Sequence, residues 1–241
     1  MRDGESLDLI ASLMEAPDAD DLWRRINQAA VALGFERALV GLQIQLPGMS
    51  PIQHVISGWP DQYQLIYAER DYVLRDPTVA HCQISTAPII WTPDIYPRES
   101  LEVLEESRRF GLHHGVSMAV HGLSRTKSML SLARDQRLDV DPRETRRVLA
   151  GAKVLATCAH MALEDLLVPD LLQREFPKKL TPRESEIMQY VANGKGSEVI
   201  GDLLGLSKAT VEFHVKNLLR KLGVASRLQG VARAVALGLV R

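Results

Sequence analysis

Residues 180–223 read LTPRESEIMQYVANGKGSEVIGDLLGLSKATVEFHVKNLLRKLG, and this stretch decides the fold of the C-terminal part of the chain. Thr181, Pro182 and Glu184 are spaced as the N-cap, first residue and third residue of a helix with a capping box. Gly194 follows the last residues of this pattern and is typical of a helix C-terminus. The stretch therefore opens on a helix whose two ends are both predicted.

Two further helices are predicted by the rest of the stretch. Residues 198–204 favour a short helix that ends at Gly205, and Ser207 is a suitable N-cap for a third helix that runs to Leu222. The apolar residues of this third helix recur at helical spacing and are predicted to face the domain core: Val211, Val215, Leu218 and Leu222. A short helix, a glycine-containing turn and a longer helix with a polar outer face indicate a helix-turn-helix.

The outer face of the third helix mixes basic, amide, hydroxyl and aromatic groups, which can contact phosphates and base edges. The predicted DNA-binding residues are Lys208, Thr210, Glu212, Phe213, Lys216, Asn217, Arg220 and Lys221. Residues 177–241 hold 11 Lys and Arg against 5 Asp and Glu, whereas residues 1–176 hold 18 against 25. This division favours double-stranded DNA as a partner of the basic part. The alternative is a small helical bundle with a solvated basic face.

Length and composition narrow the class of protein. A chain of 241 residues with 46% hydrophobic residues is expected to form two packed domains. No basic leader and no apolar run of about 20 residues are present, so we expect a cytoplasmic protein with no membrane partner. Cys82 and Cys158 are far apart and lack metal-ligand spacing, so no disulfide, metal site or cofactor is predicted.

The N-terminal part alternates predicted helices and strands. Four apolar or β-branched runs predict strands, at Ala38–Leu46, His54–Trp59, Gly115–His121 and Ser128–Arg134. A long apolar pattern from Pro142 to about Leu167 predicts a helix, whose end is marked by Pro169. Because the turns between strands are short, we expect a mostly antiparallel sheet with helices on both faces.

The predicted fold class is thus α+β. An N-terminal α/β/α sandwich is expected over residues 1–170, a linker over residues 171–178, and an all-α four-helix helix-turn-helix domain over residues 179–241.

The C-terminal domain resembles that of LuxR-type regulators. The resemblance is carried by Leu180-Thr-x-Arg-Glu184, Gly194-Lys195, Ile200, Leu204-Gly205-Leu206-Ser207, Thr210-Val211, His214, Asn217 and Lys221-Leu222-Gly223. It implies that the helix after Ser207 enters the major groove of DNA. Two residues depart from the family pattern: Val199 stands where Glu is usual, and Glu212 where Lys or another polar residue is common. The family's operator sequence is therefore not transferred to this chain.

The N-terminal domain resembles the acyl-homoserine-lactone-binding domain of quorum-sensing receptors. The matching segments are Trp59-Pro60-x-x-Tyr63-x-x-x-Tyr67, Asp76-Pro77-Thr-Val, Trp91, Gly111-Leu-His-His-Gly115 and Ser128-x-x-Ser131. The same helix-turn-helix also ends phosphorylated response regulators, but the acidic pair, phosphorylated Asp and distal Lys of a receiver domain are not found here.

The resemblance implies a ligand with a polar lactone and amide on an apolar acyl tail. The residues that carry over as its binding site are Trp59, Tyr63, Tyr67, Asp76, Trp91 and Ser131. A carboxylate such as Asp76 accepts from an amide N–H, and hydroxyl or indole groups donate to carbonyl oxygens. The family has Tyr and then Trp at the first two aromatic positions, whereas this chain has Trp59 and then Tyr63. The resemblance therefore gives the lactone-carbonyl donor role to the Tyr63 hydroxyl.

The expected function is a homodimeric quorum-sensing transcriptional regulator that binds an acyl-homoserine lactone and promoter DNA. One alternative keeps the DNA-binding domain and gives the sensor domain another small molecule or no ligand. A second alternative is an enzyme fused to a DNA-binding module. No nucleophile and base pair, phosphate-binding loop or metal cluster supports the enzyme, so none is expected.

Overall fold

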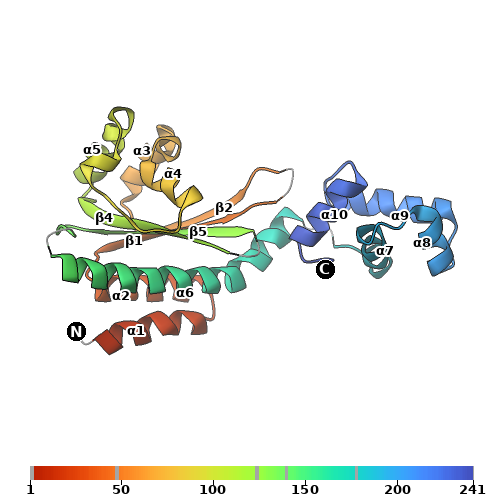
Figure 1. The fold of residues 1–241 in the computed structure, drawn as a ribbon, viewed down its shortest axis with the longest axis horizontal. Helices are drawn as coiled ribbons and strands as arrows, with labels where there is room; N and C mark the ends of the chain where they lie inside the picture. The colour runs from red at the N-terminus through yellow and green to blue at the C-terminus, as the bar shows by residue number, and fades with distance from the viewer. Residues whose placement is uncertain (1–2, 47–48, 123–124, 139–140, 177–178, 241) are drawn as a thin grey trace. The chain divides into compact units, whose positions relative to one another are not determined.

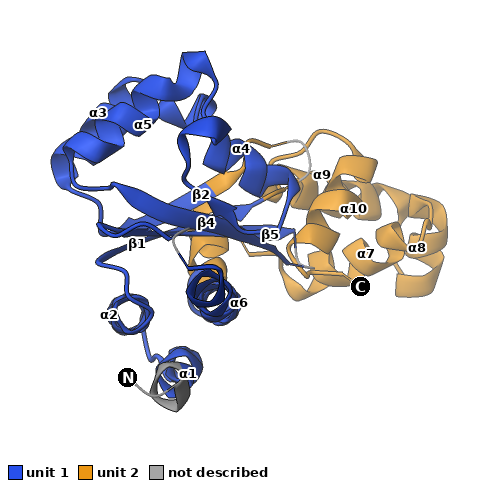
Figure 2. Cartoon of the chain, turned by 60° about the vertical axis from the view of Figure 1, so that its left-hand side comes forward, with its two compact units in different colours: residues 1–44, 53–167 blue, residues 45–52, 168–241 orange. Residues whose placement is uncertain are grey.

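The computed structural model describes residues 3–46, 49–122, 125–138, 141–176 and 179–240. The chain divides into two compact units (Figure 2). The first comprises residues 1–44 and 53–167, and the second comprises residues 45–52 and 168–241. In the described ranges, no helix combines the length and apolar character needed to cross a bilayer.

A five-stranded sheet forms the centre of the first unit, in the order β2-β1-β5-β4-β3. The strands are β1 (Arg37–Ile44), β2 (Ile52–Ser57), β3 (Ile89–Ile90), β4 (His114–His121) and β5 (Thr126–Arg134). The pairs β1 with β5, β5 with β4, and β4 with β3 are antiparallel. All four predicted strands are present, and β2 begins two residues earlier than expected. The prediction of a mostly antiparallel sheet is confirmed.

Helices cover both faces of this sheet, as Figure 1 shows. One face carries α2 (Ala19–Ala32) and α6 (Pro142–Glu175), with α1 (Asp3–Ala11) packed against α2. The other face carries α3 (Asp61–Glu69), α4 (Pro77–Ile84) and α5 (Leu101–Arg109). Short 3-10 turns lie at Ser12–Glu15, Tyr72–Leu74, Pro93–Ile95 and Arg98–Ser100. The expected α/β/α sandwich is therefore confirmed.

The sheet face toward α2 and α6 is a closed apolar core. Alternate residues of a strand point to the same face of a sheet, and on this face most of those from β1, β4 and β5 are buried. The core includes Leu22, Ile26, Val40, Leu42, Met118, Leu130, Leu132 and Leu155. The six residues predicted for ligand binding lie on the opposite side of the sheet from this core, and the cavity that they line is described below.

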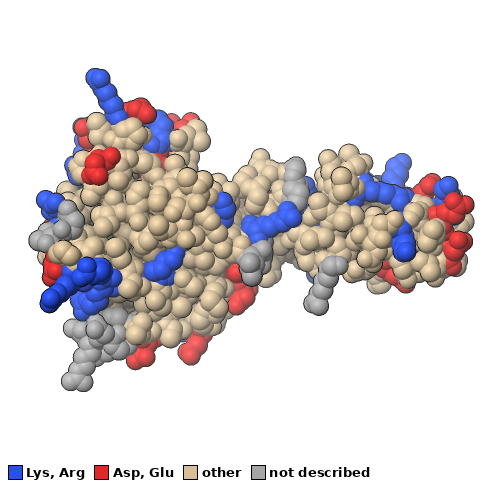
Figure 3. All heavy atoms as spheres, in the orientation of Figure 1, with Lys and Arg blue, Asp and Glu red and all other residues tan. Residues whose placement is uncertain are grey.

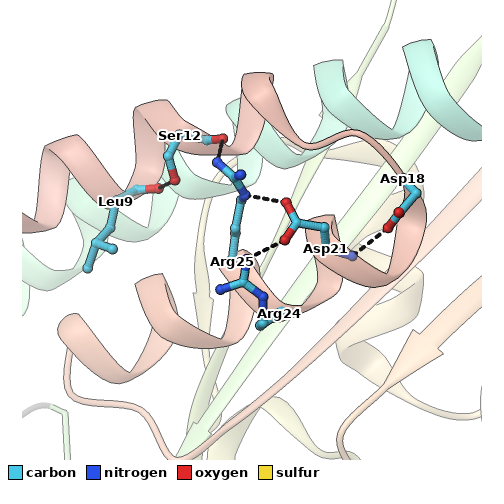
Figure 4. A network of polar contacts seen from close by, with 6 residues as sticks. All are labelled: Leu9, Ser12, Asp18, Asp21, Arg24 and Arg25. Atoms are coloured by element: carbon cyan, nitrogen blue, oxygen red, sulfur yellow. Dashed lines mark hydrogen bonds and ion pairs between the residues drawn. The ribbon is translucent and has the colours of Figure 1, made fainter.

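The turn before α2 is held by charged and capping groups (Figure 4). Asp18 is the N-cap of α2, and its carboxylate accepts the Asp21 backbone N–H at 2.8 Å. Asp21 in turn pairs with Arg24 and Arg25. Arg25 also donates to the Ser12 carbonyl oxygen at 2.6 Å, so one side chain joins α2 to the 3-10 turn that follows α1.

Helix α6 is longer than the sequence predicts. It continues through Pro169 to Glu175, so the expected end near residue 167 was wrong, and residues 171–175 of the expected linker are helical. Proline inside a helix removes one N–H and costs about 3 kcal/mol, but it does not forbid helix where the freed carbonyl reaches water. Asp165, whose carbonyl loses that N–H, is at an exposed position, as is Pro169 itself.

After the end of α6, the described residues of the second unit form four further helices: α7 (Pro182–Ala192), α8 (Ser197–Leu204), α9 (Lys208–Lys221) and α10 (Arg227–Ala236). Both the Thr181–Glu184 capping box and the Ser207 N-cap are formed. The four apolar residues predicted on the inner face of α9 are at most 5% exposed, and they pack with Ile187, Met188 and Ile200. The predicted four-helix domain is therefore confirmed.

Candidate ligand cavity and nucleic-acid interface

A cavity of about 410 Å³ lies between the sheet and the layer of α3, α4 and α5. All six residues predicted for ligand binding line it: Trp59, Tyr63, Tyr67, Asp76, Trp91 and Ser131. They come from the turn before α3, from α3 itself, from the start of α4, from the end of β3 and from β5. The fold thus gathers onto one cavity residues that are widely separated in the sequence.

Asp76 is the N-cap of α4 and is held by protein groups alone. Its Oδ1 accepts from the Thr78 backbone N–H at 2.8 Å and from the Thr78 hydroxyl at 2.7 Å, and its Oδ2 accepts from the Tyr67 hydroxyl at 3.0 Å. Burial raises the pKa of the Asp76 carboxyl above its usual value, although the hydrogen bonds from Thr78 and Tyr67 lower it. The carboxyl is an acceptor at the wall of the cavity.

A second polar group on the cavity wall is a chain of three side chains. The Trp91 indole Nε1–H donates to the Ser117 hydroxyl at 2.9 Å, and Ser117 is 2.8 Å from the Ser131 hydroxyl. Sequence reasoning missed Ser117. The predicted strand bounds do not fix the register that places Ser117 directly opposite Ser131, so the sequence alone carried no signal for it. Gly115 lets the indole lie close to β4, because a Cβ there would be 2.6 Å from the Trp91 ring.

Aromatic rings form the rest of this end of the cavity. Trp59 meets Trp91 edge to face with ring centroids 6.1 Å apart, and Tyr63 meets Tyr67 in the same way at 5.8 Å. Tyr63 is only 3% exposed, yet within the described part of the chain its hydroxyl has no hydrogen-bond partner. Burial, with the nearby Asp76 charge, raises the pKa of Tyr63, so this hydroxyl keeps its proton. It is a donor left free on the cavity wall.

The remainder of the wall is mostly apolar. It includes Leu39, Gly41, Val55, Val73, Val79 and Met129. A cavity with hydrogen-bonding groups at one end and an apolar wall beyond them suits a small molecule with a polar head and an apolar tail.

On the second unit, the predicted DNA-binding residues lie along α9. Lys208, Glu212, Phe213, Lys216 and Arg220 are exposed, and Phe213 has 62% of its surface accessible. Thr210 and Asn217 are half-buried on the same helix. Figure 3 shows basic side chains over the part of this unit where α9 lies. The exposed face of α9 thus keeps the mixture of groups that phosphate and base contacts require.

Lys221 is set apart from this group. Its Nζ is 2.6 Å from Glu184 Oε2 and 3.2 Å from the Lys179 carbonyl oxygen. Glu184 is 4% exposed and also accepts from the Thr181 backbone N–H at 2.7 Å. Burial raises the pKa of Glu184, but the Lys221 ammonium and the Thr181 hydrogen bonds outweigh it, so the pKa is lowered overall. The Lys221 ammonium therefore forms an ion pair with Glu184 inside the domain.

A unit with a ligand-sized cavity and a helix-turn-helix unit in one chain define a ligand-sensing transcriptional regulator. The model of the autoinducer binding domain matches residues 18–163, and that of the luxR family of bacterial regulatory proteins matches residues 178–234. The chain belongs to the LuxR family of quorum-sensing transcriptional regulators.

Two of the proteins that resemble the chain do so over nearly its whole length, and a third resembles its N-terminal two thirds. The transcriptional activator protein AnoR of Acinetobacter nosocomialis is 31% identical, over 97% of this chain and 98% of that protein. The structure of Escherichia coli SdiA has a TM-score of 0.77 at 23% identity and covers 98% of both chains, and SdiA has also been solved with octanoyl-rac-glycerol. The N-acylhomoserine lactone dependent factor CepR2 of Burkholderia cenocepacia has a TM-score of 0.60 at 25% identity, over 69% of this chain and 99% of its own.

Proposed function

We propose that this regulator binds an acyl-homoserine lactone in the cavity of its first unit and binds promoter DNA through α9, as a homodimer. The observation that carries the ligand proposal is the free Tyr63 hydroxyl beside the paired Asp76 carboxyl on one cavity wall.

The lactone head suits the groups at the polar end. A ligand amide N–H needs an acceptor, and Asp76 has one oxygen that takes only the Tyr67 hydroxyl among the described hydrogen bonds. A ligand carbonyl needs a donor, and Tyr63 offers one that competes with no internal bond. The Trp91 N–H, by contrast, already donates to Ser117. Because the Trp91 donor is already used and the Tyr63 donor is not, these bonds support Tyr63 as the donor to the lactone carbonyl, as expected from the exchange of Trp59 and Tyr63 relative to the family.

The relatives support a ligand with an acyl tail. CepR2 is described as N-acylhomoserine lactone dependent, and SdiA holds octanoyl-rac-glycerol. Both molecules pair a polar head with an apolar chain, which matches the polar end and apolar wall of this cavity. The second candidate ligand is accordingly a monoacylglycerol, whose head offers hydroxyl groups and no amide N–H.

The DNA proposal rests on α9. Its N-terminus is capped by Ser207, its inner face is buried, and three exposed cations lie along its outer face: Lys208, Lys216 and Arg220. A second helix of a helix-turn-helix enters the major groove with its N-terminal residues toward the bases. Glu212 lies in this position, where a carboxylate can accept from a cytosine amino group.

The ligand proposal is tested by calorimetric titration of the full chain with octanoyl-homoserine lactone and, separately, with octanoyl-rac-glycerol. We expect the lactone to bind more tightly and to be recovered intact, since a receptor does not turn its ligand over. Tighter binding of octanoyl-rac-glycerol would mean that the cavity binds a monoacylglycerol and not a lactone. Recovery of hydrolysed lactone would mean that the protein is an enzyme.

The DNA proposal is tested by titration with promoter DNA at several salt concentrations. If α9 contacts phosphates, the affinity for DNA should fall as the salt concentration rises.

A further inference from the structure

The cavity side of the sheet is ordered into three rungs that cross β1, β5 and β4. The serine rung is Leu39, Ser131 and Ser117; the apolar rung is Gly41, Met129 and Ala119; the amide rung is Gln43, Lys127 and His121. Ser131 and Lys127 are four residues apart on β5, so at about 3.3 Å per residue the outer rungs are separated by about 13 Å. The floor of the cavity is therefore polar, then apolar, then polar again.

The amide rung is tied to the C-terminal end of α4. Gln83 Nε2 donates to Gln43 Oε1 at 3.0 Å, and Lys127 Nζ donates to the Gln83 carbonyl oxygen at 2.8 Å. His121 Nε2 lies 2.9 Å from the Cys82 carbonyl oxygen. The last carbonyls of a helix lack partners within the helix and attract cations. Side chains of β4 and β5 thus supply those partners, and Gln43 of β1 accepts from the Gln83 side chain, so three neighbouring strands contact this end of α4.

These ties lie at one end of the cavity, at an edge that is exposed to solvent. Gln43, Gln83 and Lys127 all line it, and the Gln43–Gln83 hydrogen bond joins its floor on β1 to its roof on α4. The roof helix begins at Asp76, beside the polar end where the ligand head is proposed to bind. A tail that extends from this head across the apolar rung meets the amide bridge next.

We propose that the Gln43–Gln83 bridge is the chain-length stop of this receptor and selects acyl tails that end over the apolar rung. The inference rests on the proposed lactone-binding function and adds to it the residues that set its selectivity. A longer tail has to break the Gln43–Gln83 hydrogen bond and place its last methylenes at an exposed edge of the cavity, where they gain little from burial. A shorter tail leaves part of the apolar rung uncovered and loses the burial of its missing methylenes.

The test measures affinity of the full chain for butanoyl, hexanoyl, octanoyl, decanoyl and dodecanoyl homoserine lactones by calorimetry. For the wild type we expect affinity to rise by about fourfold per buried methylene up to one length and then to fall. Gln43→Ala and Gln83→Ala remove the bridge, so the optimum should move to a longer tail. The first tail beyond the wild-type optimum should gain up to about sixteenfold in affinity relative to that optimum, because each of its two further methylenes contributes about fourfold when it is fully buried.

A change in the opposite direction comes from filling the apolar rung. Gly41→Ala adds a methyl group whose nearest neighbour is Val55 Cγ2 at 3.9 Å, an ordinary contact that needs no movement of the backbone. This variant keeps the bridge and shortens the space before it, so the optimum should move to a shorter tail. Gly41→Ala keeps the proposal falsifiable even where loss of the bridge lowers the yield of folded protein.

The control is Gln28→Ala, which removes an exposed amide from α2 on the other side of the sheet and should leave the length profile unchanged. If the bridge variants and Gly41→Ala all show the same dependence of affinity on tail length as the wild type, the proposed chain-length stop is wrong, although lactone binding itself still stands. Absence of binding by the wild type to every lactone would instead overturn the proposed function, and this inference with it.

Discussion

Single residues in the cavity differ in whether their hydrogen-bonding groups are already used. The Tyr67 hydroxyl donates to Asp76 and the Trp91 indole donates to Ser117, so both serve to position other side chains. Tyr63 lines the cavity, and its hydroxyl makes no such bond among the described residues. A donor on a cavity wall that is not used by the protein can donate to a ligand, so in the proposed function Tyr63 is the residue that contacts the ligand carbonyl.

The first prediction compares two tyrosines on α3. Tyr63→Phe keeps the ring and removes the free donor, so it should weaken lactone binding by about 0.5–1.5 kcal/mol and leave the stability of the ligand-free chain nearly unchanged. Tyr67→Phe removes a donor to Asp76 and should lower that stability. Calorimetry and thermal unfolding, applied to both variants, separate the two effects. Equal lactone affinity in wild type and Tyr63→Phe would remove Tyr63 from the site.

The second prediction concerns Asp76 and pH. Burial raises the pKa of Asp76 in the folded chain, so the carboxyl favours folding most when protonated, and this contribution is lost as pH rises through the folded pKa. Asn at this position does not titrate and retains N-cap ability. The unfolding temperature of the wild type minus that of Asp76→Asn should therefore fall as pH rises above about 4, the usual pKa of an Asp carboxyl. A difference that does not change with pH would contradict this.

At the scale of elements, local sequence patterns predicted correctly those features that depend only on residues close together in the chain. The capping residues Thr181 and Ser207 define helix starts as predicted, because a cap acts within one turn. The end of α6 was missed because the effect of Pro169 depends on whether the freed carbonyl reaches solvent, which spacing does not reveal.

The candidate site shows the same limit of sequence reasoning. Its six residues were proposed from a family resemblance, and the fold brings all six to one cavity. Ser117 and the Gln43–Gln83 bridge depend on strand register and on where α4 crosses the sheet. Those are contacts between distant segments, and they become visible only when strands and helices are placed in space.

The third prediction distinguishes two lysines of α9. Lys221→Met leaves the buried Glu184 without its ammonium partner and should lower the free energy of unfolding by about 1–3 kcal/mol. The exposed Lys216→Met should change stability little but should reduce the salt dependence of DNA binding by about one ion. Chemical unfolding and DNA titration over a salt series measure both. Reversed results would mean that Lys221, and not Lys216, lies along the phosphates.

The Glu184 ion pair adds a pH signature to this comparison. Its pKa is lowered in the folded chain, so the stabilisation is present above the unfolded pKa and is lost as pH falls through the folded one. The stability difference between wild type and Lys221→Met should therefore shrink in acid.

At the scale of the whole molecule, a sensor and a DNA-binding unit share one chain, and the proposed homodimer would present two copies of α9 to DNA. Helix α6 carries an outward stripe at positions i, i+4, i+7 and i+11, formed by Ala150, Val154, Thr157 and Met161. Val154 is 43% exposed and Met161 is 48% exposed. A self-complementary apolar stripe on a long helix is suited to a two-fold contact between identical chains.

The fourth prediction tests this contact. Val154→Glu combined with Met161→Glu places like charges on both sides of a two-fold interface and should convert the dimer to a monomer, as measured by light scattering during gel filtration. Affinity for DNA with two half-sites should fall, because the second α9 no longer benefits from being tethered to the first, whereas affinity for one half-site should change little. Leu65→Glu, at an exposed apolar position of α3 on the opposite side of the sheet, is the control and should stay dimeric. A dimeric α6 variant with unchanged two-site affinity would place the interface elsewhere on the chain.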